Sequence, residues 1–108
     1  MLVFLAQGCE ELEAVTVLDL LQRANIEVVS AGLDKYPVKA SHGVTLAADM
    51  TADEALRQDD FDLGVLPGGL PGAENLSRHP GVLDAVRTCL ADPSRFVGAI
   101  CAAPMVLA

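Results

Sequence analysis

Residues 96–104 read Phe-Val-Gly-Ala-Ile-Cys-Ala-Ala-Pro, an apolar run that is interrupted by a cysteine. Phe96 to Ile100 has the length and composition of a buried strand, and the residues after Cys101 have the composition of a helix start. A strand that turns directly into a helix around a cysteine has the form of a nucleophile elbow. Its sharp backbone reversal requires small residues two positions before and after the nucleophile. Ala99 and Ala103 meet this requirement.

Such a turn places the thiol of Cys101 at the carboxyl end of a strand, where open α/β sheets bind their ligands. The partial positive charge of a helix N-terminus would also favour the thiolate form of Cys101. The alternative is that Cys101 is a small buried hydrophobic residue, which is the usual fate of a lone free cysteine. The local pattern alone does not separate these two interpretations.

Strand and helix patterns alternate along the rest of the chain. We predict strands over residues 1–6, 26–31, 63–66 and 96–100, and helices over residues 10–23, 51–57, 80–91 and from 102 onward. Residues 37–40 and 44–46 flank Ser41-His42-Gly43 and are typical of an inserted hairpin. Alternating strands and helices imply parallel strands with crossover helices, so the predicted fold class is α/β with a doubly wound parallel sheet.

Composition limits the class of protein. The 108 residues form one domain at most, 52% of them are hydrophobic, and the formal net charge is −8. A charge this negative argues against nucleic acid or an anionic membrane as a partner, because both would be repelled. No apolar run approaches the ~20 residues that span a bilayer. The three cysteines show no CxxC spacing, so neither a disulfide framework nor a zinc site is indicated. Together these features predict a cytoplasmic protein.

Two further features could belong to a site around Cys101. Gly68 and Gly69 directly follow a predicted strand, and their N–H groups could point into one crevice as an oxyanion hole requires. The alternative is an ordinary glycine-rich loop. Glu13 lies at the flank of the apolar stripe of the first helix, where partial desolvation favours a protonated carboxyl that could share its proton with a thiolate. The alternative is a surface carboxylate in an acidic first turn.

The other chemically capable side chains are weaker candidates. His42 falls in the predicted hairpin turn and is expected to be solvated. His79 precedes a helix and is expected to cap it or to lie on the surface. For Cys9 and Cys89 we expect packing roles.

Four motifs follow one another in order: Gly8-Cys-Glu-Glu-Leu-Glu-Ala-Val15, Val65-Leu-Pro-Gly-Gly69, Gly72-Ala-Glu-Asn-Leu76 and Ala99-Ile-Cys-Ala-Ala-Pro104. Each motif is modest alone, but the ordered set is very specific. With these motifs the chain resembles the ThiJ/PfpI superfamily over all 108 residues. It is most similar to the branch of the parkinsonism-associated protein deglycase and bacterial YajL.

The resemblance implies a flavodoxin-like sandwich that usually forms a homodimer. It makes Cys101 the nucleophile and the oxidation-sensitive cysteine, and it gives Glu13 the place of a protonated glutamate that hydrogen-bonds the thiolate. Gly68, Gly69 and the N–H of Ala102 fall where the family has oxyanion donors. The implied activity is a glyoxalase or deglycase that acts on α-oxoaldehydes or early glycation adducts, without metal or organic cofactor, in oxidative and carbonyl stress. The alternative is a redox-sensing chaperone whose Cys101 is oxidised to sulfinate.

The chain also departs from the family pattern. The family's domain is longer, so we expect residues 1–108 to be the N-terminal portion of a single domain that is truncated after the nucleophile elbow. The histidine that often flanks the nucleophile would then lie in the absent portion, and neither His42 nor His79 maps to it. His42 stands near the expected dimer face, where close relatives often carry Arg. We also expect the apolar residues of the final helix, Pro104 to Leu107, to lack a covering element.

Overall fold

The computed structural model describes residues 1–58, 61–101 and 103–107. Within these residues the main sheet has five parallel strands in the order β5-β2-β1-β6-β7. Its strands are β1 (Leu2–Leu5), β2 (Val29–Gly32), β5 (Met50–Thr51), β6 (Leu63–Leu66) and β7 (Phe96–Ala99). The antiparallel hairpin consists of β3 (Val38–Lys39) and β4 (Thr45–Leu46). The helices are α1 (Glu11–Arg23), α2 (Ala52–Gln58), α3 (Leu70–Ser77), α4 (Pro80–Ala91) and the 3₁₀-helix η1 (Ala103–Leu107). The predicted fold class is confirmed.

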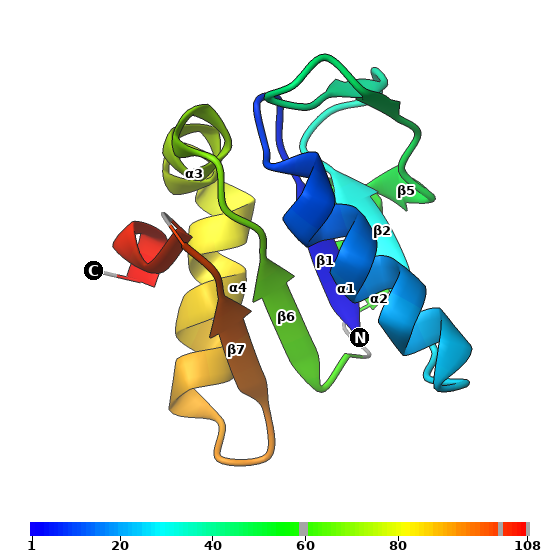
Figure 1. Cartoon of the computed structure of the whole chain (residues 1–108). Coiled ribbons are helices and arrows are strands. Elements are labelled where there is room, and N and C mark those ends of the chain that lie inside the picture. The colour runs from blue at the N-terminus through cyan, green and yellow to red at the C-terminus, as the bar shows by residue number, and fades with distance from the viewer. Residues whose placement is uncertain (59–60, 102, 108) are drawn as a thin grey trace.

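The sheet is covered on its two faces by different helices. In β1, Leu2 and Phe4 pack into a cluster with residues of α2, α3 and α4, while Val3 and Leu5 pack with α1 and the hairpin. Figure 1 shows α1 in front of β1 and β2, α4 behind β6 and β7, and α3 beyond the carboxyl ends of β6 and β7. Because β1 is buried on both faces, its sequence is a continuous apolar run. No helix within the described ranges is long and apolar enough to cross a membrane.

Strand β7 forms one edge of the sheet, and its α1-side face is open. Val97 and Ala99 pack against the cluster that includes α4, so Phe96 and Gly98 face the other side. The side chain of Phe96 is 66% exposed, and a Cβ at Gly98 would meet no described atom within 4 Å. Within the described residues, α1 lies over β1 and β2 and leaves this face of β7 uncovered.

Several predicted elements are confirmed and others differ. The bounds of β6 and α4 agree with the prediction, and the hairpin forms around Ser41-His42-Gly43. Strand β2 begins three residues later than predicted because Asn25, with φ of 59°, ends α1 and the Ile26 N–H still donates to the Leu21 carbonyl. Helix α3 was not predicted. It lacks a side-chain N-cap bond because Gly69 stands at its N-cap, and Gly72 lowers the helix propensity of its first turn.

The expectation for the residues after Cys101 was wrong in one respect. Ala103–Leu107 form a short 3₁₀-helix that packs against α3. Val106 is only 4% exposed and belongs to the same cluster as Ala103, although Pro104 is exposed. The turn at Cys101 directs the chain back onto α3, so the chain itself covers part of this apolar surface. Residues 102 and 108 of the predicted helix lie outside the described residues.

Candidate active site at the carboxyl ends of the central strands

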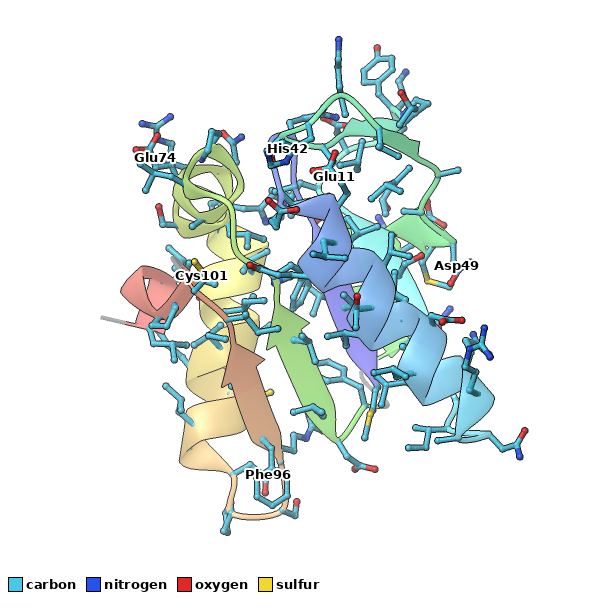
Figure 2. The ribbon with its side chains drawn as sticks, in the orientation of Figure 1. Glu11, His42, Asp49, Glu74, Phe96 and Cys101 are labelled. Atoms are coloured by element: carbon cyan, nitrogen blue, oxygen red, sulfur yellow. The ribbon has the colours of Figure 1, made fainter. Side chains whose placement is uncertain are left out.

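The candidate site lies where β1, β6 and β7 end. Parallel strands present their carboxyl ends at one edge of a sheet, and three turns meet there: residues 6–10, 67–69 and 100–101. Figure 2 shows Cys101 at the end of β7, beside the start of η1. The sequence-predicted candidates Cys101, Glu13 and Gly68 all belong to this edge.

Cys101 occupies a sharp and strained turn. Its φ is 55°, in the left-handed region that costs a residue with a Cβ roughly 1–2 kcal/mol. The Ile100 N–H donates to the Leu66 carbonyl at 3.2 Å, and the Ala103 N–H donates to the Ile100 carbonyl at 2.9 Å, which tightens the reversal. The side chain of Cys101 is exposed. The strand-to-helix reversal therefore presents the thiol at the surface of the site.

Gly68 is the point on which the candidate residues converge. Its N–H donates to Glu13 Oε1 at 2.9 Å, and its carbonyl accepts the Glu10 N–H at 2.8 Å. A Cβ at Gly68 would collide with Glu13 Oε1 and would lie 2.9 Å from both Cys101 Cβ and the Ile100 carbonyl oxygen. Only glycine lets the carboxyl group of Glu13 and the Cys101 turn approach this loop so closely.

The hydrogen bond from Gly68 has two chemical consequences. The Gly68 N–H, which the sequence predicted as an oxyanion donor, is already engaged by Glu13. Because Glu13 Oε1 accepts this bond, a proton on the carboxyl group would sit on Oε2.

The second predicted donor, Gly69, also needs to be glycine. Gly69 has φ of 91°, and a Cβ there would lie 2.7 Å from both the Glu10 nitrogen and the Gly8 carbonyl oxygen. The third predicted donor, Ala102, lies outside the described residues.

Glu11 has a role that the sequence analysis missed. Figure 2 shows Glu11 and His42 side by side where α1 begins. The carboxylate of Glu11 accepts hydrogen bonds from the N–H groups of His42 and Val44 and from Ser41 Oγ, and its Oε1 lies 2.9 Å from His42 Nδ1. Burial alone would raise the pKa of Glu11, but the hydrogen bonds it accepts outweigh that effect and lower its pKa to about 2. The sequence signal was weak: an acidic residue in a helix first turn and a distant Ser-His-Gly turn.

His42 is exposed, as the sequence predicted, but its ring also contacts two carboxylates. Its side chain is 72% exposed, yet Nδ1 lies 3.3 Å from Glu10 Oε2 as well as close to Glu11. The hydrogen bond to Glu11, together with the charges of Glu10 and Glu11, raises the pKa of His42. Among the described residues, Glu10, Glu11 and His42 are the group whose atoms could hold a metal ion, all within 4.8 Å of one another. Both carboxylates already accept protein hydrogen bonds, so these residues carry no metal assignment.

The remaining candidates have structural roles. His79 caps α4 by accepting the Val82 N–H at Nδ1, over 3.2 Å. Cys9 and Cys89 are buried, as predicted. Burial, followed by the negative charge of Glu11, raises the pKa of the Cys9 thiol. A cleft of about 450 Å³ lies between α2 and α4, and none of its lining residues belongs to the carboxyl-end site.

The sequence of the chain matches a known protein family. The model of the DJ-1/PfpI family matches residues 1–108. The Parkinson disease protein 7 homolog of Danio rerio is 41% identical over 107 residues, which cover 98% of this chain and 56% of that protein. The glutathione-independent glyoxalase DJR-1.2 of Caenorhabditis elegans is 32% identical over 101 residues, which cover 94% of this chain and 53% of that protein.

Solved structures agree with the sequence comparison. The crystal structure of Drosophila melanogaster DJ-1beta superposes with a TM-score of 0.92 at 40% identity, covering 98% of this chain and 56% of that one. The chain thus spans about half the length of the relatives that it matches. The match over the whole chain, together with the shared fold, shows that this chain belongs to the DJ-1/PfpI family.

Proposed function

We propose that this chain carries the reactive centre of a cysteine-dependent, cofactor-independent glyoxalase or deglycase that acts on α-oxoaldehydes or their early glycation adducts. The observation that carries the proposal is the convergence of Cys101 and the Glu13 carboxyl group on Gly68. A nucleophile beside a carboxyl group that can move a proton is the minimum that this chemistry needs. The name of the Caenorhabditis elegans relative, a glutathione-independent glyoxalase, supports the same class of reaction.

In the proposed reaction the Cys101 thiolate adds to the aldehyde carbon of methylglyoxal, and the carbonyl oxygen takes a proton from Glu13 Oε2 to give a hemithioacetal. Glu13 then removes the proton on that carbon and returns it to the neighbouring carbon through an enediol, while the hydroxyl proton of the first carbon passes to the oxygen of the second. This internal transfer oxidises the first carbon to a thioester and reduces the second to an alcohol. Water cleaves the thioester, which releases lactate and restores the thiol. No external oxidant or reductant is required.

The hydrogen bond between Gly68 and Glu13 changes the assignment of the oxyanion donors. The Gly68 N–H orients Glu13, so in our proposal the amides of Gly69 and Ala102 hold the substrate oxygen. Preorganised N–H donors of this kind stabilise developing negative charge because they need not reorient during the reaction. In this proposal Gly68 acts indirectly, by holding Oε1 of Glu13 and leaving Oε2 for the proton transfer.

A redox-sensing chaperone is the second candidate, and one observation favours it. Of the three cysteines, Cys101 is exposed, whereas Cys9 and Cys89 are buried. A peroxide could oxidise the Cys101 thiolate first to sulfenate and then to sulfinate, with one peroxide reduced to water in each step. In that case Glu13 would donate a hydrogen bond to the oxidised sulfur and turnover would be incidental.

We also propose that the protein forms a homodimer in the cytoplasm, as the family resemblance implies. Helix α1 exposes Leu12, Val15 and Leu20 on its solvent side, and burial of such residues would favour self-association. Sedimentation equilibrium of the intact protein tests this expectation. A mass equal to one chain at all concentrations would contradict it.

The test of the proposed activity compares the intact protein with two variants, using lactate formation from methylglyoxal followed by NMR. Cys101→Ser removes the nucleophile and should abolish turnover. Glu13→Gln keeps a hydrogen-bond donor near the sulfur but cannot move a proton, so turnover should fall by roughly 10²–10⁴. Full turnover by Cys101→Ser would overturn the proposal. An inactive wild-type protein whose Cys101 is oxidised by peroxide to sulfinate would favour the chaperone.

A further inference from the structure

The turn of the β3–β4 hairpin wraps around the carboxylate of Glu11. The N–H groups of His42 and Val44 and the hydroxyl of Ser41 all donate to this group, at 3.0 to 3.3 Å. Gly43, between the two backbone donors, has φ of 87°, and alternating backbone conformations of this kind form a concave nest for anions. The side chain of Glu11 is 13% exposed. The turn therefore binds a carboxylate that belongs to another part of the same chain.

Backbone hydrogen bonds continue this contact along the β1–α1 loop. The Gly8 N–H donates to the Lys39 carbonyl, and the Ser41 N–H donates to the Cys9 carbonyl, both at 2.8 Å. The Lys39 N–H donates to Gln7 Oε1 at 2.9 Å. The hairpin thus lies against the whole loop that leads from β1 into α1, and it covers Cys9.

The opposite side of the same helical turn faces the candidate active site. Glu11 and Glu13 are two residues apart, so their side chains leave α1 about 200° apart around its axis. Glu11 meets the hairpin, while Glu13 meets Gly68. The Glu10 N–H donates to the Gly68 carbonyl between them. The first turn of α1 is consequently held from two sides.

We propose that Glu11 is a positioning residue: by docking the hairpin turn onto the first turn of α1, it holds the Glu13 carboxyl group in register with Gly68 and Cys101. Its effect on turnover rests on the function proposed above, whereas its effect on the site itself does not. The carboxylate is suited to this task because charge-assisted hydrogen bonds are stronger than neutral ones. Its removal would leave the N–H groups of His42 and Val44 and the hydroxyl of Ser41 without this acceptor.

The test substitutes Glu11→Gln, with Asp19→Asn as the matched control. Asp19 is an exposed acid on the same helix that pairs with Arg23, so both variants lose one negative charge from α1. Three quantities are measured on the intact protein: alkylation of Cys9, the pH profile of Cys101 alkylation, and kcat and KM for methylglyoxal. The alkylation rate of Cys9 measures whether the hairpin is docked. The pH profile of Cys101 alkylation depends on where the Glu13 carboxyl group lies relative to the thiol.

For Glu11→Gln we expect faster alkylation of Cys9, a shifted pH profile for Cys101, and a fall in kcat of about 10–10²-fold with KM little changed, as for a small misplacement of a catalytic group. Asp19→Asn should match the wild type in all three. Undocking of the hairpin with an unchanged Cys101 profile would overturn the proposal, as would no effect at all. If the wild type shows no turnover, the function proposal fails, and the two alkylation measurements still decide the role of Glu11.

A second variant covers the case in which Glu11→Gln does not fold. A Cβ at Gly43 would meet no described atom within 4 Å, so Gly43→Ala strains only the backbone of the nest and leaves Glu11 in place. It should change Cys9 alkylation and the Cys101 profile in the same direction, by a smaller factor. A Gly43→Ala protein with a faster Cys9 reaction but an unaltered Cys101 profile would contradict the positioning role.

Discussion

The turn after β6 and the turn after β7 meet at one site but are stabilised in different ways. Gly68 is buried and hydrogen-bonded through both its N–H and its carbonyl to the β1–α1 region. Cys101 is exposed, has a left-handed φ, and follows a strand with an open face. The difference indicates that packing fixes the carboxyl side of the site, whereas a strained backbone on an edge strand presents the thiol.

The largest difference in stability should appear between apolar residues of the two strands. Leu66 ends β6 and is fully buried, so Leu66→Ala should lower the free energy of unfolding by about 2–5 kcal/mol. Phe96 begins β7 and is mostly exposed, so Phe96→Ala should change it by less than about 0.5 kcal/mol. Urea denaturation of the two variants measures both. Equal losses would show that β7 is packed as tightly as β6.

Adding a Cβ at a glycine should change stability less than Leu66→Ala does. The change should be destabilising after β6 and neutral or stabilising in β7. Gly68→Ala forces the Cβ into Glu13 and toward the Ile100 carbonyl, which should cost about 1–3 kcal/mol by overpacking. Gly98→Ala meets open space and should be neutral or stabilise by up to about 1 kcal/mol, because alanine loses less backbone entropy than glycine. Denaturation together with methylglyoxal turnover checks this pair. A fully active and stable Gly68→Ala protein would show that the site does not require glycine at position 68.

The strain at Cys101 can be measured with two variants that both lack the thiol. Glycine adopts positive φ without steric cost, so Cys101→Gly should be more stable than Cys101→Ala by about 1 kcal/mol. Thermal unfolding of the two proteins gives the difference directly. If alanine proves equal or better, the turn is not strained and the thiol is presented without a cost in backbone energy.

The smallest expected effect concerns pH and the hairpin. The pKa of Glu11 is lowered from 4.5 to about 2, so its stabilising contribution is complete above pH 4.5 and is lost as the pH falls toward 2. The pKa of His42 is raised from 6.5, so its contribution is complete below pH 6.5 and is lost as the pH rises through the raised value. The contact is therefore strongest between about pH 4.5 and 6.5.

His42→Gln tests this dependence. The variant should be less stable than the wild type at pH 5.5, and the difference should be smaller at pH 9, because the contribution of the His42 charge is lost as the pH rises through its raised pKa. Urea midpoints at the two pH values provide the measurement. A difference of equal size at both values would mean that the charge of His42 does not contribute.

Sequence patterns predicted those parts of the molecule whose signals are local. Strand β6 and helix α4 follow from apolar runs and from Pro80 at a helix start, and the position of Glu13 beside the buried stripe follows from helical periodicity. Helix α3 was missed because its N-cap, Gly69, offers no capping side chain and Gly72 lowers the helix propensity of its first turn. The sequence patterns did not predict the hydrogen bond between Glu11 and the hairpin, because it joins residues that are 31 apart through backbone N–H groups. Backbone donors are the same for every residue type except proline, so the pattern of side chains carries no trace of them.

The central claim, that Cys101 is the reactive thiol of this chain, is tested most directly by competitive alkylation at pH 6, where an ordinary thiol is largely protonated. Peptide mapping then gives the rate for each cysteine separately. Cys101 is exposed in a strand-to-helix turn, whereas Cys9 and Cys89 are buried, so we predict that Cys101 is modified well before both. Similar rates for all three cysteines, or faster modification of Cys9 or Cys89, would contradict the account.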